Sequence, residues 1–545
     1  MPPRSRPTVA CFSIRLGGLI LTAATLLGTP VVAQKPGTRK AAAPPPGFDA
    51  YVASVLKTFS VPGVAVAIVK DGQVVLARGY GVRRLGEPTP VDAQTQFGIA
   101  SNTKVFTATA LAMLVEEGKV AWDAPVIRYL PWFAMYDPYV TRELTVRDLL
   151  VHRSGLGLGA GDLLWWPPST YNRKEIARRL RYIAPATSFR SAYAYDNVLY
   201  LVAGELIEAV SGQTWEEFVR SRILARVGMT HSDVNHSAAG RGGNVATPHA
   251  EVNDTVRPVA PFLSDNTNPA GGIVSGAEDM AKWVMAQLDS GRTADGTRLV
   301  SPASIRQIWR EVTPTPIYDA PEGLPHLQPR MNGYALGLET KDYRGRLLLT
   351  HTGGLPGYLS RVAMLPELRL GVVVLTNQES GAAFNAIAYR VLDHYLGVKA
   401  ADYVGAYARQ VARNRAELAE LSSRASTERD STAGPSLPLE RYAGTYRDAW
   451  YGDVAITQEN GGLVIRMTRT PSMVGDLIHW QYDTFLARWR DRELRADAYV
   501  TFALTPDGKV DQAKMAPTSP SVDFSFDFQD LLLRPVVDSA LRSTP

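Results

Sequence analysis

Cysteine is almost absent from this chain of 545 residues, and its scarcity excludes several kinds of site. The single cysteine, Cys11, lies in the N-terminal segment, ahead of an apolar run. If that segment is removed, the rest of the chain can form no disulfide and has no thiol nucleophile and no cysteine-ligated metal. The eight histidines show no His-Glu-x-x-His or comparable spacing, so we expect neither a metal nor a cofactor.

Long apolar runs are equally scarce. The run Leu16 to Leu27 follows three arginines and precedes Ala33, which predicts a signal peptide over residues 1–33 and a periplasmic or secreted protein. An N-terminal membrane anchor is the alternative, but the run is too short to span a bilayer comfortably. No later segment is long and apolar enough to span one, so we expect no stable membrane insertion after cleavage.

A strong excess of one charge is missing as well. The chain has 58 basic and 53 acidic residues, and removal of the three arginines in residues 1–33 leaves 55 basic residues against 53 acidic ones. No basic run with interleaved aromatic residues occurs. We therefore expect no nucleic-acid partner.

The hydrophobic pattern predicts two folded regions joined by a polar segment. Residues 34–47 are rich in proline and are expected to form an extended tether. Residues 48–395 begin with a helix and a hairpin that turns at Asp71-Gly72. Further elements are predicted as helices at 48–59, 107–117, 144–150, 197–210, 215–224 and 279–288, and as strands at 64–69, 73–77, 346–351, 361–365 and 371–376. These elements predict an α/β (α+β) domain whose antiparallel sheet combines strands from both ends of the domain, with helices beside it.

The C-terminal part has a different pattern of predicted secondary structure. Residues 396–438 are predicted to be a helical connector followed by a polar linker at 422–436. Residues 439–535 show closely spaced strand patterns, typical of a small β-barrel or sandwich. The segment 522–528 alternates strictly between polar and apolar residues, which predicts a half-buried strand. We expect this module to be separable from the first domain by limited proteolysis between 422 and 436.

Ser101 and Lys104 form a Ser-x-x-Lys motif at the start of a predicted helix. Positions three apart share one helix face, so both side chains should project together. A serine hydroxyl needs a neighbouring base to become a nucleophile, and a lysine can be that base when burial lowers its pKa. The helix N-terminus adds positive potential where an oxyanion would form. A capping serine beside a solvated lysine is the alternative interpretation.

Two other short motifs occur at element boundaries. Tyr195-Asp196-Asn197 precedes a predicted helix, and His351-Thr352-Gly353-Gly354 follows a predicted strand. Taken singly, they could be a buried tyrosine, a helix cap and an ordinary histidine at a strand end. We expect His152 to be structural, and the pair Trp165-Trp166 either to line a pocket or to pack in the core.

The order of these three motifs resembles that of the penicillin-recognising serine hydrolases. The resemblance is closest to the class C β-lactamase-like members, which include D-stereospecific aminopeptidases, DD-peptidases and esterases. It covers residues 48–395, and it extends to other segments: Arg78 to Gly81, Leu149 to Leu156, Pro269 to Gly272 and His351 to Tyr358. It implies a β-lactamase/transpeptidase-like sheet flanked by helices, with a helical subdomain. Residues 439–535 resemble the lipocalin-like β module appended to many relatives.

The resemblance implies roles for the three motifs. Ser101 would become acylated, while Lys104 and Tyr195 would share the proton transfer as a coupled pair, with the charge of Lys104 helping Tyr195 to form a phenolate. Asn197 would donate a hydrogen bond to the amide on the acyl side of the substrate.

The strand-end motif would complete the site. The oxyanion hole would use the backbone N–H groups of Ser101 and Gly354, with Gly353 beside them in the substrate-binding strand. His351 stands where β-lactamases of this type carry lysine, and a histidine is mostly neutral at pH 7. This difference weakens the binding of a substrate carboxylate.

We therefore expect an exported serine hydrolase that cleaves D-amino-acid peptides, DD-peptides or small esters through an acyl-enzyme. A β-lactamase of weak activity and a non-catalytic, penicillin-binding-like protein of the cell wall are the alternatives. The sequence leaves open the natural substrate, its stereochemistry, the oligomeric state and the role of the C-terminal module.

Overall fold

The computed structural model describes residues 42–238 and 242–536. The predicted signal peptide, Cys11 and most of the predicted tether lie outside the described residues. The described residues from Ala43 onward form one compact unit.

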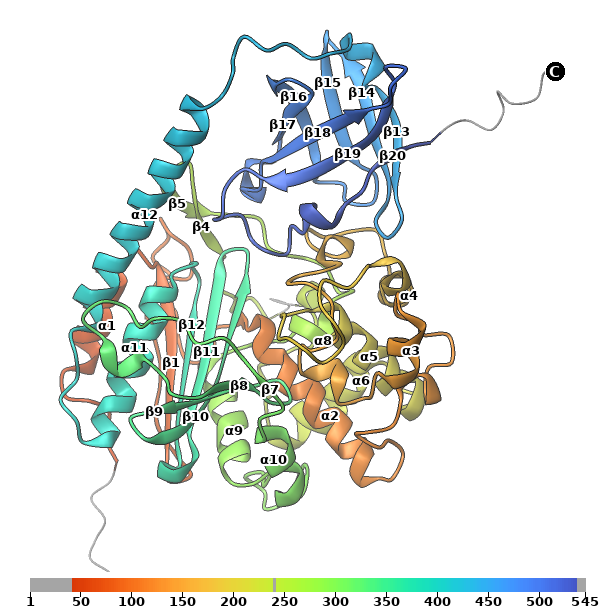
Figure 1. Cartoon of the computed structure of the whole chain (residues 1–545). Coiled ribbons are helices and arrows are strands. Elements are labelled where there is room, and N and C mark those ends of the chain that lie inside the picture. The colour runs from red at the N-terminus through yellow and green to blue at the C-terminus, as the bar shows by residue number, and fades with distance from the viewer. Residues whose placement is uncertain (1–41, 239–241, 537–545) are drawn as a thin grey trace, which may run out of the picture. The chain divides into compact units, whose positions relative to one another are not determined.

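One antiparallel sheet organises the first domain (Figure 1). Its strands, in spatial order, are β2 (Gln73–Gly81), β1 (Gly63–Lys70), β12 (Leu370–Thr376), β11 (Tyr358–Leu365), β10 (Arg346–Leu355), β9 (Glu339–Tyr343), β8 (Asn332–Tyr334) and β7 (Thr313–Pro314). Strand β1 pairs with β12, with Val64 opposite Thr376. The sheet thus joins the two ends of the domain, as the sequence predicted.

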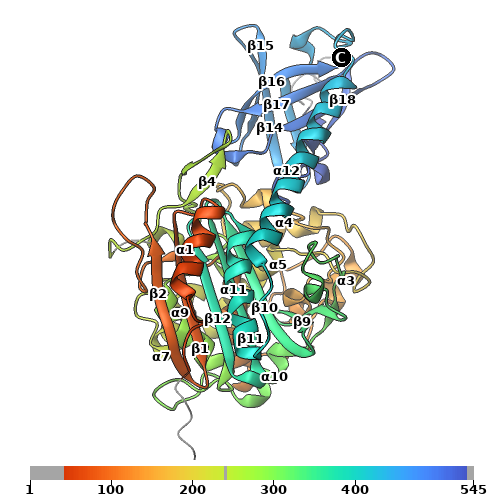
Figure 2. The same ribbon diagram turned by 90° about the vertical axis from the view of Figure 1, so that its left-hand side faces the viewer.

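The sheet separates two apolar cores because successive strand residues point to opposite faces. In β12, Val372 and Val374 belong to the core that holds α1 and α11. Val373 and Leu375 belong to the core that holds α2 and α9. Figure 2 shows α1 and α11 lying over the first of these faces.

Helices cover both faces of the sheet. Most of them come from the part of the chain that follows β2 and precedes β7. Their bounds are α1 Phe48–Thr58, α2 Lys104–Glu116, α3 Pro138–Glu143, α4 Arg173–Arg179, α5 Val198–Ser211, α6 Trp215–Val219, α7 Ala225–Val227, α8 Asn268–Gly271, α9 Ala277–Leu288, α10 Pro302–Trp309, α11 Gly381–Leu396 and α12 Tyr403–Thr427. Two short ladders accompany them: β3 (Phe97–Gly98) with β6 (Val274–Ser275), and β4 (His249–Val252) with β5 (Thr255–Pro258). The helices predicted at 48–59, 107–117, 197–210 and 279–288 are confirmed.

One predicted helix is wrong. Residues 144–150 form only a single 3-10 turn at Asp148–Leu150. The carboxylate of Asp148 accepts hydrogen bonds from the backbone N–H and the hydroxyl of Thr145, and it also pairs with Arg190. These side-chain bonds stabilise a turn rather than a continuing helix.

The C-terminal module is a nearly closed antiparallel barrel of eight strands. Its strands are β13 Gly444–Asp448, β14 Gly452–Glu459, β15 Gly462–Met467, β16 Val474–Gln481, β17 Thr484–Trp489, β18 Ala498–Leu504, β19 Val510–Pro517 and β20 Arg534–Pro535. The two edge strands of this sheet are β19 and β20. Ala513 of β19 and Leu533, next to β20, exchange backbone hydrogen bonds of 2.8 and 3.0 Å, which bring the two edges together.

The strand predicted at 522–528 is wrong. This segment is an irregular loop that ends in a 3-10 turn at Phe528–Asp530. Its apolar residues Phe526 and Phe528 are buried, but the apolar Phe524 is exposed, and of its polar residues only Asp523 is exposed. Ser525 and Asp527 are buried against the first domain, so the alternation reflects two buried surfaces rather than one buried strand face.

Helix α12 continues past residue 421 into the predicted linker at 422–436 and ends at Thr427. Among the helices of residues 42–238 and 242–536, none combines the length and apolarity needed to cross a membrane.

Candidate active site

Ser101 lies in a tight 3-10 turn, Ala100–Thr103, that leads directly into α2 at Lys104. Ala100 has a φ of 47°, in the left-handed region that a residue with a Cβ rarely adopts. Strand β10 passes against this turn at Gly353, where a Cβ would lie 2.3 Å from the carbonyl oxygen of Ile99. Only glycine allows this approach, so Gly353 brings the strand end to Ser101.

The structure brings together the three residues predicted to carry the chemistry. The Ser101 hydroxyl oxygen lies 2.9 Å from Lys104 Nζ and 2.9 Å from the Tyr195 hydroxyl. Tyr195 comes from the segment that opens α5, 94 residues away in the chain.

Lys104 is completely buried, and its amine has three polar neighbours. Besides Ser101, these are Oδ1 of Asn197 at 2.7 Å and the carbonyl oxygen of Ala270 at 3.0 Å. A neutral amine has two hydrogens and one lone pair. If the hydrogens go to the two carbonyl oxygens, the lone pair is left facing the Ser101 hydroxyl, which is the arrangement a base requires.

Burial lowers the pKa of Lys104 to about 7, against the opposing effect of the carboxyls of Asp162 and Asp196. Burial in turn raises the pKa of each of these carboxyls to about 7. The three groups therefore titrate as one coupled cluster, in which a neutral amine is well populated near pH 7.

Asp162 is a candidate functional residue that the sequence did not indicate. Its carboxylate accepts hydrogen bonds from Nε1 of Trp165 at 2.9 Å and from Nδ2 of Asn197 at 2.8 Å. No motif marks Asp162 in the sequence, because its importance depends on contacts with residues that are distant in the chain.

The expected Tyr195 phenolate is wrong for this resting site. Tyr195 is enclosed, and burial raises its pKa well above the ordinary value of a phenol. The Ser101 hydrogen bond acts in the opposite direction but is the smaller effect. Tyr195 is therefore a neutral phenol that donates to Ser101, and Lys104 is the group with the pKa of a base.

Asn197 lies between Lys104 and Asp162 instead of facing solvent. Its Oδ1 accepts from the Lys104 amine, and its Nδ2 donates to Asp162. This orientation of the amide satisfies both neighbours, whereas the flipped amide would oppose donor to donor and acceptor to acceptor. One Nδ2 hydrogen remains, so a contact with the substrate amide stays a prediction.

His351 lines the same pocket as a neutral imidazole. Burial lowers its pKa to about 4. Nδ1 lies 2.5 Å from the carbonyl oxygen of Thr352 and Nε2 lies 2.8 Å from the Tyr334 hydroxyl, so both ring nitrogens are engaged. His351 thus offers little positive charge to a substrate.

His152 packs against the rings of two residues of the site. Its ring centroid lies 4.3 Å from that of Tyr195 and 4.5 Å from that of Tyr334. Its Nδ1 accepts from the backbone N–H of Asp196 at 3.1 Å. These contacts fit the structural role that the sequence suggested.

Ser101 opens into a cavity of about 270 Å³. Its lining includes Gly354 and both Trp165 and Trp166, and it also includes three residues of the C-terminal module: Asp523, Phe524 and Ser525. A second, mainly apolar cavity of about 580 Å³ shares Trp166, Gly354, Leu355 and Asp523 with the first. The module is thus part of the wall around Ser101.

Comparison with protein families gives two matches. The family model described as "Beta-lactamase" matches residues 48–396, and a domain of unknown function (DUF3471) matches residues 428–535.

Individual relatives agree with the first match. The unguisins hydrolase ungD of Aspergillus violaceofuscus is 30% identical over 448 residues, which cover 78% of each chain. Penicillin-binding protein 4 of Amycolatopsis lactamdurans is 28% identical over 339 residues, covering 61% of this chain and 85% of that protein. The solved octameric penicillin-binding protein homologue from Pyrococcus abyssi shares the fold with a TM-score of 0.56 at 21% identity, covering 89% of this chain and 98% of that one.

Proposed function

The chain belongs to the beta-lactamase family of serine hydrolases. From this premise we propose that it cleaves amide or ester bonds in uncharged substrates through an acyl-enzyme on Ser101. The observation that carries the proposal is the 2.9 Å contact between Ser101 Oγ and a buried Lys104 amine whose other two neighbours are hydrogen-bond acceptors.

The proposed acylation step moves one proton and forms one bond. Lys104 Nζ accepts the proton of the Ser101 hydroxyl as Oγ bonds to the substrate carbonyl carbon. The carbonyl oxygen becomes an oxyanion between the backbone N–H groups of Ser101 and Gly354. The C–N or C–O bond then breaks, and the leaving group takes a proton delivered from Lys104 through the neutral phenol of Tyr195. Water then attacks the acyl carbon while Lys104 accepts its proton; the bond from that carbon to Ser101 Oγ breaks, Oγ takes the proton back from Lys104, and the acid is released.

The charges around the pocket support substrates without a carboxylate. His351 is neutral, and the rim of the 580 Å³ cavity carries more acidic than basic side chains. There Arg495 pairs with Glu379, while Asp491 and Asp523 add further acidic groups. A β-lactam or a free C-terminal carboxylate would meet acidic groups, so these features weigh against an efficient β-lactamase.

The size and lining of the cavity favour an apolar substrate group. Most of its wall is apolar, including Trp166, Val259, Phe262, Leu355 and Phe526. We propose peptides with an apolar, uncharged residue beside the scissile bond, D-aminoacyl amides among them, and small apolar esters. The similarity to a protein named as an unguisins hydrolase supports hydrolytic activity in general.

A fluorophosphonate probe tests the covalent step. We expect one adduct per chain, located on Ser101 by peptide mass analysis. Ser101→Ala should show none, while the matched control Ser519→Ala, in an exposed turn of the C-terminal module, should label as wild type does. An adduct that persists on another residue in Ser101→Ala would overturn the assignment.

A substrate screen then tests the finer proposal. Apolar D- and L-aminoacyl amides, short esters and a chromogenic cephalosporin should be compared, with the cephalosporin expected to be the poorest substrate. Export is a separate proposal based on residues 1–33. It is tested by N-terminal sequencing of the protein released from cells, which should begin at Gln34.

A further inference from the structure

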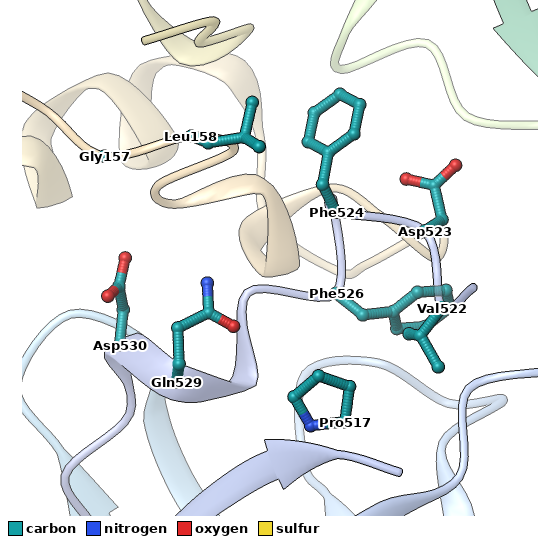
Figure 3. Close-up of a pocket in the computed structure, with 9 residues that line it drawn as sticks. All are labelled: Gly157, Leu158, Pro517, Val522, Asp523, Phe524, Phe526, Gln529 and Asp530. Atoms are coloured by element: carbon teal, nitrogen blue, oxygen red, sulfur yellow. The ribbon is translucent and has the colours of Figure 1, made fainter. Parts of the chain in front are cut away.

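The C-terminal module sends a loop into the first domain. The loop, residues 522–530, lies in the connection between β19 and β20 and faces the turn that contains Gly157 and Leu158. Figure 3 shows Phe524 of the loop beside Leu158 of that turn. The Phe524 ring also meets the Tyr195 ring edge-on, with centroids 6.0 Å apart.

Asp527 anchors the loop by backbone contacts to the first domain. One carboxylate oxygen accepts from the N–H of Gly161 at 2.6 Å and the other from the N–H of Leu163 at 3.1 Å. The approach is close: a Cβ on Gly159, whose φ is already +69°, would lie 2.7 Å from the carbonyl oxygen of Phe524. The loop and the turn at 159–163 are therefore fitted to each other.

Ser525 connects this anchored loop to Lys104, the proposed base. Its hydroxyl donates to Oδ2 of Asp162 at 2.9 Å, and the same oxygen accepts from Nδ2 of Asn197 at 2.8 Å. Oδ1 of Asn197 then lies 2.7 Å from Lys104 Nζ. A continuous series of hydrogen bonds thus runs from the barrel to the amine beside Ser101.

We infer that Ser525 is a positioning residue of the hydrolase: through Asp162 and Asn197 it holds the Lys104 amine in line with Ser101, so that the C-terminal module completes the active site. This inference rests on the proposed function, because it assumes that Lys104 is the base for Ser101.

The charged groups around Lys104 determine the direction of the expected pH effect. Asp162 and Asp196 raise the pKa of Lys104. His152 and His351 face the same region as neutral rings, since burial lowers the pKa of each.

The neutral rings of Tyr195 and Tyr200 lie 4.9 and 5.1 Å from the amine. The Ser525 hydrogen bond lowers the pKa of Asp162 and so favours its anion. Without that bond Asp162 is more often protonated, and the pKa of Lys104 falls.

The test is the rate at which a fluorophosphonate labels Ser101, measured in the full-length protein between pH 5 and 9. In Ser525→Ala we expect the high-pH plateau to fall roughly tenfold to a hundredfold, as for a displaced catalytic group, and the acid limb to move to lower pH. Asp162→Asn removes the anion itself and should move the limb in the same direction. Ser525→Thr keeps the hydroxyl and should recover the plateau.

Ser519→Ala, in the segment that leads from β19 to the loop, is the matched control and should behave as wild type. The inference is overturned if Ser525→Ala labels like wild type. It is also overturned if the plateau falls while neither Ser525→Ala nor Asp162→Asn shifts the limb, since that pattern indicates only a packing role. Absence of labelling in wild type would instead overturn the proposed function.

Discussion

The amine of Lys104 lies 2.7 Å from Oδ1 of Asn197, and this contact helps to direct the lone pair of a neutral amine towards Ser101. Asn197 is in turn held by Asp162. This order of contacts supports the proposal that Lys104 accepts the serine proton while Tyr195 acts as a donor.

The pH dependence of hydrolysis should report the Lys104 cluster. On a neutral ester, kcat/KM should rise about tenfold per pH unit below pH 7 and level off above it, because the active form of Lys104 is the neutral amine. The apparent pKa of about 7 belongs jointly to Lys104, Asp162 and Asp196. Lys104→Arg keeps a cation that cannot act as a base, so activity should be lost across the whole range. A wild-type profile that is flat from pH 5 to 8 contradicts this assignment.

Tyr195→Phe should reduce kcat by roughly 10²- to 10⁴-fold, the usual effect of losing a general acid–base group. The ring and its contact with His152 remain, and only the hydroxyl that donates to Ser101 is removed. Because burial raises the pKa of Tyr195, wild-type activity should show no loss from its ionisation below pH 9. Steady-state kinetics on an ester decide the point, with the melting temperature as control. Near wild-type turnover would assign all proton transfer to Lys104.

His351→Lys should favour substrates that carry a carboxylate. The quantity to measure is kcat/KM for a carboxylate-bearing amide divided by that for its neutral ester. In wild type this ratio should stay flat from pH 5 to 8, because the pKa of His351 is about 4 and the ring remains neutral. In the variant a fixed positive charge should raise the ratio, since charge-assisted hydrogen bonds are stronger than neutral ones.

Glu339 provides the control for this experiment, because it lines the same cavity. Its carboxylate would compete for the new lysine. The double variant His351→Lys with Glu339→Gln should therefore gain more than the single variant. An unchanged ratio in both would show that position 351 does not face the substrate carboxylate.

A cut in the linker should not release the C-terminal module. A Cβ added at Gly434 would meet no atom within 4 Å beyond its own chain neighbours, so a protease site inserted after this residue should be tolerated. After cleavage the fragments should co-elute on size exclusion and keep their activity. Asp527 holds the turn at Gly161 and Leu163, and Tyr171 donates to the carbonyl oxygen of Tyr451 at 2.5 Å.

Dissociation of the nicked fragments with full activity retained would contradict the role given to the module. An uninserted protein treated in parallel is the control for proteolysis elsewhere. From the sequence we expect a module that separates from the first domain once the linker is cut. The contacts of Asp527 and Tyr171 predict instead that the cut fragments stay bound.

Local sequence patterns were sufficient for most of the architecture. Alternating and apolar runs predicted β1, β10, β11 and β12, because strand periodicity is a local property. The Asp71-Gly72 turn adopts positive φ at both residues, 53° and 78°, as a tight hairpin requires. The segment 522–528 shows the limit of such patterns: its alternation is real, but Ser525 and Asp527 are buried by contacts with the first domain, which no local pattern records.

The sequence alone singled out Ser101, Lys104 and Tyr195, because the order of their motifs resembles that of a known family, and the structure brings the three side chains together. Only the tertiary structure determined their protonation. A pKa depends on burial and on charges brought together by the fold, such as Asp162 near Lys104 and Glu339 near His351. For the same reason the sequence could place a β module after the first domain, but only the packing of Ser525 and Asp527 against residues 159–163 shows that the module lines the site.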